Sequence, residues 1–125
     1  MKNVEWWRGT ANKMWRTYFT LKRQQEDGRD MSAISSAERK IFDICDRVLT
    51  EKFVHLDQDI LRTYFTSRWG DDLYTVEDYS LKHNVPVNVI WIVIRRAMRT
   101  AMEETGLLDR KEETDEQVQR DRTDP

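Results

Sequence analysis

The chain has few of the residues that form disulfides and tight turns. Its 125 residues include one cysteine, two prolines and four glycines. The single thiol, Cys45, excludes a disulfide framework and a cysteine zinc site, and we expect it to be a small core residue. Many short strands joined by tight turns would need more glycine and proline, so the composition favours helices.

A long hydrophobic run is also missing. The apolar stretch from Val85 to Ile94 is too short to cross a bilayer. Lys2 is not followed by the apolar run of a signal peptide, because Arg8 and Lys13 interrupt the segment. We therefore expect a cytoplasmic protein with no membrane partner. A length of 125 residues indicates one domain.

The net charge of −2 excludes a uniformly basic protein, but it hides an uneven distribution. Residues 1–25 carry six Lys or Arg and one acid, whereas residues 81–101 carry four Lys or Arg and no acid. Residues 102–125 carry nine acids and four bases. The two basic segments are therefore candidates for contact with phosphate groups.

The spacing of apolar residues predicts an all-α protein of about five helices, the first of them within residues 1–30. One face of this basic, aromatic helix carries apolar residues three and four apart: Val4, Trp7, Ala11, Met14, Tyr18 and Leu21. This stripe could pack on a second copy, making a homodimer, or cover the rest of the same chain. Trp6 and Trp15 lie off the stripe, where packing or self-association competes with nucleic-acid stacking or membrane-surface contact.

Start signals mark the next two helices. Ser35 and Glu38 have the spacing of a capping box. The helix that follows them is expected to bury Ile41, Cys45 and Val48. Asp57 is the expected cap of a third helix. The buried residues of that helix are expected to be Ile60, Leu61, Tyr64 and Phe65.

The C-terminal part predicts a short helix, a turn and a long helix. Thr75 is the expected cap of the short helix, and Asn84 is its expected left-handed terminator. Pro86 suits a first helical position and Gly106 a C-terminal stop, so we expect one helix from about Pro86 to Thr105. Its inward face is expected to carry Ile90, Ile94, Ala97 and Ala101. Its outward face is expected to carry Asn88, Ile92, Arg95 and Arg99, with Arg96 at the edge and Trp91 on a shoulder.

This order of elements fits a helix-turn-helix unit. Ser80 is the small residue that lets the second helix pack closely, and Asn84 tolerates the left-handed backbone of the turn. Val85 is the apolar plug of the turn, and Ile90 and Ile94 face back toward the first helix. The free N–H groups and dipole at the start of the second helix could then meet phosphate.

The segments "LDQDILRTYF" and "YTVEDYSLKHNVPVNVIWIVIRRAMRTAMEETGLL" carry a family resemblance. Together they resemble the C-terminal module of small phage late-gene transcription regulators of the ArpU and RinA type. Those modules are similar to the fourth region of bacterial sigma factors, and the likeness covers about 50 residues, less than half of the chain. Family members are taken to activate late phage operons by binding upstream DNA.

The resemblance implies an activator in a bacterial host cell that binds double-stranded DNA, with RNA polymerase as a further partner. By position, the implied recognition face consists of Asn88, Trp91, Ile92 and Arg95, with Arg96 and Arg99 on phosphates. This chain departs from the pattern at Pro86 and Val87, where many such modules have Ser or Thr followed by polar residues. Trp91 and Ile92 also make the outer face more apolar than that of most DNA readers.

Two alternatives follow from these departures. One is a protein-interaction module that contacts the host transcription machinery or another regulator through Trp91 and Ile92. The other keeps the DNA contact but serves as the DNA-recognition subunit of a phage packaging motor.

The sequence predicts neither an enzyme nor a cofactor site. It shows no Gly-rich phosphate loop, no nucleophile elbow and no Cys/His set, and His55 and His83 lack a second ligand at metal-binding spacing. The expected organisation is therefore an N-terminal helix in residues 1–30 and a helical domain in 31–108. That domain contains the helix-turn-helix at about 56–108, and a disordered acidic tail follows in 109–125.

Overall fold

The computed structural model describes residues 6–67 and 72–108, with side chains throughout these ranges except at residues 72–74. Over the described ranges the chain is all-α, as predicted, with five α-helices, a short 3₁₀ helix and no strand. The elements are α1 (Arg8–Glu26), η1 (Met31–Ala33), α2 (Ser36–Lys52), α3 (His55–Phe65), α4 (Asp72–His83) and α5 (Val87–Thr105). None of the described helices combines the length and hydropathy needed to cross a bilayer.

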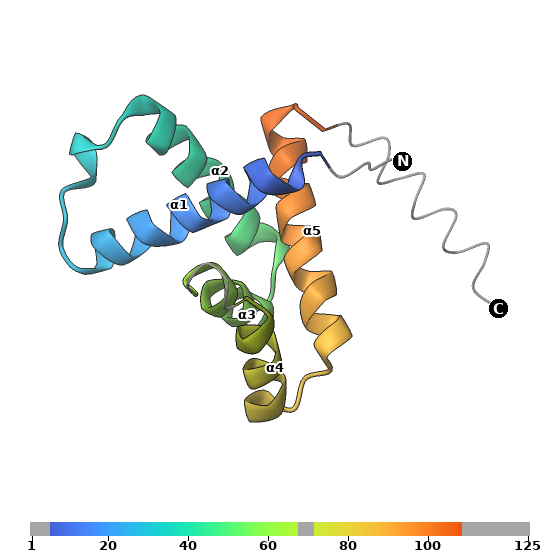
Figure 1. The fold of residues 1–125 in the computed structure, drawn as a ribbon. Coiled ribbons are helices and arrows are strands. Elements are labelled where there is room, and N and C mark those ends of the chain that lie inside the picture. The colour runs from blue at the N-terminus through green and yellow to red at the C-terminus, as the bar shows by residue number, and fades with distance from the viewer. Residues whose placement is uncertain (1–5, 68–71, 109–125) are drawn as a thin grey trace.

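The long helix α5 contacts each of the other four α-helices that the structure describes (Figure 1). α1 and α2 pack against each other and against α5, and Figure 1 shows α1 crossing the C-terminal half of that helix. α3 and α4 pack on the other half of α5 and on each other. α3 also contacts α1, so the two pairs of helices share one core.

Trp15 of α1 lies at the centre of that core and is fully buried. Its ring stacks on Phe19 and Phe65, with centroids 5.9 Å away in both cases. Its indole Nε1 donates a hydrogen bond to the backbone oxygen of Ala97 at 3.0 Å. One side chain therefore joins α1, α3 and α5, and its polar atom has a partner despite its burial.

The predicted stripe of α1 packs inside the chain. Its described members are all buried: Trp7, Ala11, Met14, Tyr18 and Leu21, whereas Val4 lies outside the described residues. Trp15 and Phe19, which lie off the stripe, are buried too, because α1 contacts α2, α3 and α5 and so is covered over a wide arc. The structure therefore resolves Trp15 as a core residue, whereas Trp6 is 65% exposed.

The predicted capping box of α2 is confirmed. The Ser35 side chain accepts from the Glu38 N–H, and the Glu38 carboxylate accepts from the Ser35 N–H. Cys45 is buried, as expected, and that burial raises the pKa of its thiol far above the ordinary value. The thiol therefore stays protonated and is a poor nucleophile.

Two predicted helix starts are wrong. α3 begins at His55 with Val54 as its N-cap, and Asp57 lies inside the first turn, where a carboxylate interacts favourably with the helix dipole. α4 begins at Asp72, so Thr75 lies within the helix rather than at its cap. In both cases the helix begins further toward the N-terminus than the residue that was predicted to cap it. The predicted disordered tail, residues 109–125, lies outside the described residues.

Candidate nucleic-acid interface

A three-residue turn joins α4 to α5. Asn84 has a φ of 58°, so it adopts the left-handed conformation predicted for it. The N–H of Val85 donates to the oxygen of Ser80 at 3.2 Å, which is the long bond of a Schellman motif. Val85 is half-buried and packs on the core, as the plug of a helix-turn-helix should. The turn therefore sets the direction in which α5 leaves α4.

A hydrogen bond fixes α4 against α3. The Tyr79 hydroxyl donates to Asp59 Oδ2 at 2.7 Å, and the His83 ring lies 4.2 Å from the Tyr79 ring, centroid to centroid. Burial, together with the Asp59 carboxylate, raises the pKa of Tyr79 to about 12. The phenol is therefore protonated at neutral pH and keeps donating, which holds α4 in place beneath the start of α5.

The start of α5 has no side-chain cap. Pro86 is the N-cap residue rather than the first helical residue, a shift of one position from the prediction. Its oxygen accepts from the N–H groups of Val89 and Ile90 at 3.1 and 3.2 Å. Because no side chain covers the first N–H groups of α5, this end of the helix suits an anion such as a phosphate.

The first half of α5 places most of the predicted site residues on its outer face. Asn88 is exposed, and Ile92, one turn further on, is 59% exposed. Trp91 is half-buried, with its ring edge against Tyr64 at a centroid distance of 5.7 Å. Trp91 thus belongs partly to the core, and only part of its side chain is exposed.

Arg95 and Arg96 lie at the rim of this surface. Arg96 is exposed, and its guanidinium lies 4.9 Å from the centroid of the Phe53 ring and 3.4 Å from the backbone oxygen of Lys52. Arg95 is half-buried and takes part in interactions of its own. The Arg96 charge therefore flanks the exposed side of α5 rather than occupies its centre.

The predicted position of Arg99 on the exposed outer face is wrong. Its side chain is buried, and its Nε lies 3.4 Å from Glu103 Oε2, which is equally buried. The helical wheel places Arg99 in line with Asn88 and Ile92, but it could not show that α5 is covered on that side further along. A phosphate cannot reach Arg99 in this structure, so we leave it out of the candidate interface.

Sequence reasoning missed three exposed apolar residues around the turn and the start of α5. Leu81 on α4 is 85% exposed, and Val87 and Val89 are more than a third exposed. Val89 could have been found, because it lies three residues before Ile92 and seven before Arg96, on the same side of the helix. The candidate interface consists of exposed Leu81, Lys82, Asn88, Val89, Ile92 and Arg96.

The electrostatics of this surface come from the absence of acids. From Tyr79 to Met102 the sequence has no Asp or Glu, while it has Lys82 and three arginines. Arg99 pairs with Glu103 and is buried, so the exposed charge comes from the other cations, and from Val87 to Arg96 α5 itself supplies no acid to neutralise it. The surface therefore combines an uncapped helix start, a basic rim and an apolar centre with one amide.

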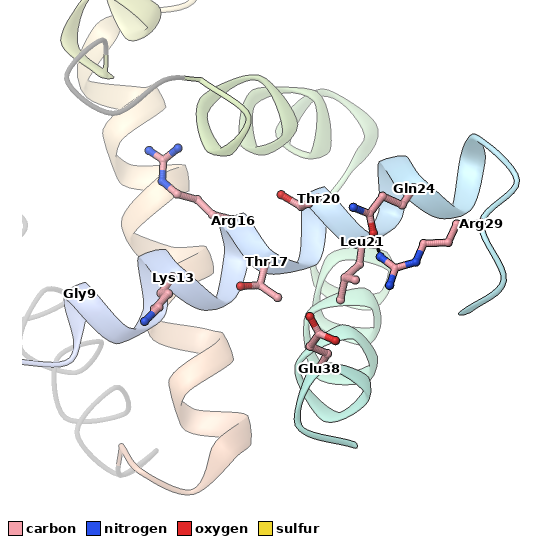
Figure 2. Close-up of a pocket in the computed structure, with 9 residues that line it drawn as sticks. All are labelled: Gly9, Lys13, Arg16, Thr17, Thr20, Leu21, Gln24, Arg29 and Glu38. Carbon is pink, nitrogen blue, oxygen red and sulfur yellow. Dashed lines mark hydrogen bonds between the residues drawn. The ribbon is translucent and has the colours of Figure 1, made fainter. Parts of the chain in front are cut away.

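A groove lies along α1, away from the candidate interface. Figure 2 shows Lys13 and Arg16 pointing to opposite sides of α1, with Glu38 reaching in from α2. Arg16 donates to the oxygens of Phe65 and Ser67, at 3.3 and 2.7 Å, and so ties α1 to the end of α3. Within this groove, Arg16 therefore connects helices.

Within the described ranges, no three His, Cys, Asp or Glu side chains lie close enough together to hold a metal ion. The chain matches no protein-family model, no curated protein and no solved structure. Its own residues and geometry therefore carry the functional argument.

Proposed function

We propose that this protein is a transcription regulator of the phage type that binds double-stranded DNA through α4, the Asn84 turn and the first half of α5. The observation that carries the proposal is the start of α5. It projects from a Schellman turn without a side-chain cap, and its exposed face has no acid. A helix presented in this way suits the major groove, where its first turns reach base edges.

The charges of the site support this role. Lys82 and Arg96 are both exposed, Lys82 in the last turn of α4 and Arg96 midway along α5, and exposed cations of this kind can contact phosphates. Asn88 lies in the first turn, where an amide can pair with adenine. Packing by Tyr64 and Trp91 holds the helix rigid, which reduces the entropy lost on binding.

The salt dependence of DNA binding tests the proposal. The full chain and its variants are titrated onto duplexes selected from random DNA, at two salt concentrations. Arg96→Ala should weaken binding to all sequences alike and lower the salt slope by roughly one unit. Asn88→Ala should cost about 1–3 kcal/mol on the selected site and little on a scrambled duplex.

Lys40→Ala is the matched control, because Lys40 is an exposed cation on α2, outside the candidate interface. The salt slope of this variant should equal that of the wild type. If Lys40→Ala and Arg96→Ala have the same effect, the binding is unspecific attraction to the whole surface. If the folded chain binds no duplex even at low salt, the proposal is wrong.

The exposed apolar residues favour a second candidate, a protein partner. Ile92 and Leu81 are more exposed than large aliphatic residues usually are, and exposed apolar patches mark protein contacts. Such a partner, for example RNA polymerase or another regulator, would bind with little salt dependence. Ile92→Ala and Leu81→Ala would then abolish that binding, whereas Arg96→Ala would change it little.

A further inference from the structure

The candidate interface has an unusual chemistry at its centre. Asn88, Val89 and Ile92 are neighbours on α5 at spacings of one, three and four residues, and all three are exposed. They offer one amide and two branched aliphatic side chains. Arg95 and Arg96 follow Ile92 by three and four residues, so these cations lie at the far edge of the group and not between its members.

Each base pair shows a different pattern in the major groove, and this centre fits one kind of pair. Guanine is read chiefly by Arg or Lys, which donate to its O6 and N7. Adenine is read by the amide of Asn or Gln, and thymine presents a methyl group that apolar side chains contact. The centre of the interface therefore has the groups for adenine and thymine and lacks those for guanine.

The placement of the cations agrees with this division. The Arg96 guanidinium lies against the Phe53 ring and the Lys52 oxygen, which draws it toward the α2–α3 junction and away from the Asn88 end of the helix. There it can meet a phosphate while the aliphatic residues face the bases. Asn88 and Ile92 are about 6 Å apart along the helix axis, which is roughly two base-pair steps.

We propose that α5 reads A·T base pairs in the major groove, with Asn88 on adenine and with Ile92 and Val89 against thymine methyl groups. This inference rests on the proposed DNA binding and names the sequences that the site prefers. It differs from a shape preference for A·T-rich DNA, because the methyl groups themselves contribute to the affinity.

Three duplexes isolate the methyl contribution. They are 24-base-pair alternating d(A–T), d(A–U) and d(G–C) stems, each closed by the same loop, and the full-length protein binds them in competition. Alternating sequence offers adenine and thymine at every register of the helix. The d(A–U) stem differs from d(A–T) only in lacking the thymine methyl groups, so the hydrogen-bonding edges are the same.

We expect d(A–T) to bind at least tenfold more tightly than d(G–C). Replacing thymine by uracil should weaken binding about fourfold for each methyl group that is buried. Ile92→Ala should shrink the difference between d(A–T) and d(A–U), whereas Asn88→Ala should shrink the difference between d(A–T) and d(G–C). Leu107→Ala is the control, because Leu107 is an exposed leucine beyond the other end of α5 and should change neither ratio.

The outcomes separate this inference from the proposed function. Equal binding of d(A–T) and d(A–U), or tighter binding of d(G–C), would overturn A·T readout by methyl contact while leaving DNA binding in place. If no stem binds at low salt to a protein that circular dichroism shows to be helical, both the inference and the proposed function fail. A thymine effect that Ile92→Ala leaves unchanged would also overturn the inference, because the methyl groups would then meet another residue.

Discussion

The two halves of α5 have opposite surroundings. Every residue from Ala97 to Glu103 is buried, including Arg99, Thr100 and Glu103. In the preceding half, from Val87 to Arg96, only Ile90, Val93 and Ile94 are buried. One continuous helix is thus a core element along one half and a presented surface along the other.

The difference comes from the neighbouring helices. α1 and α2 enclose the C-terminal half and tie to it through the Trp15 hydrogen bond to Ala97 and the 2.7 Å ion pair between Arg47 and Glu104. The N-terminal half rests on α3 and α4, which cover only its inward side. A site on the outer side of the N-terminal half is therefore supported by packed helices, as accurate recognition requires.

The largest expected effect is on stability and concerns the C-terminal half of α5, which α1 and α2 enclose. Trp15→Ala removes a fully buried indole and its hydrogen bond, so we expect the free energy of unfolding to fall by about 3–5 kcal/mol. Trp6→Ala is the matched control, since Trp6 is mostly exposed, and it should change stability by less than about 0.5 kcal/mol. Urea denaturation followed by circular dichroism measures both. Similar losses in the two variants would contradict the central role of Trp15.

Replacing one arginine in each half of α5 tests whether the two halves differ in their contribution to stability. Arg99→Met leaves the buried Glu103 carboxylate without its ion pair and should cost about 3 kcal/mol. Arg96→Met should cost little stability, because Arg96 is exposed. The double variant Arg99→Met with Glu103→Leu should recover much of the loss in thermal or urea denaturation. No recovery would mean that Arg99 acts through contacts other than this pair.

The turn between α4 and α5 should show a smaller effect. Asn84→Ala forces a residue with a Cβ and no amide into a φ of 58° and should cost about 1–2 kcal/mol. Asn84→Gly should be neutral or stabilising, since glycine adopts this conformation freely. Asn88→Ala, in the helix four residues later, should leave stability within about 0.5 kcal/mol. An unchanged stability for Asn84→Ala would show that the turn relaxes to another conformation.

The smallest expected effect depends on pH. The pKa of Tyr79 is raised from 10.0 to about 12, so the folded state binds this proton more tightly than the unfolded state does. Its contribution to stability is therefore complete below pH 10 and is lost as the pH rises through about 12. Tyr79→Phe should cost about 1 kcal/mol at neutral pH, through loss of the bond to Asp59. Urea titrations from pH 8 to 12 should show a shallower decline for Tyr79→Phe than for the wild type, and parallel curves would contradict this link.

The helical class and several local features could be predicted from the amino-acid sequence. The Ser35 capping box, the left-handed Asn84 and the end of α5 at Gly106 were predictable, because each depends on residues within about one helical turn of one another. The α1 stripe was predictable because its apolar residues repeat at helical spacing. The candidate interface was half predictable. The exposure of Asn88 and Ile92 followed from the period of the helix, but Leu81 and Val89 were not recognised as exposed residues of the interface.

Which parts of these helices are covered depends on how the helices pack in three dimensions. Periodicity assigns one inward face to a helix. It cannot show that α1 is enclosed by three helices, or that α5 is exposed on one side along its first half and buried all round along its second. For that reason the sequence left Trp15 open between packing and other roles, and it gave no sign that the Arg99–Glu103 pair is buried. Burial depends on the crossing of segments more than 80 residues apart in the chain, such as Trp15 and Ala97, and no local pattern records that crossing.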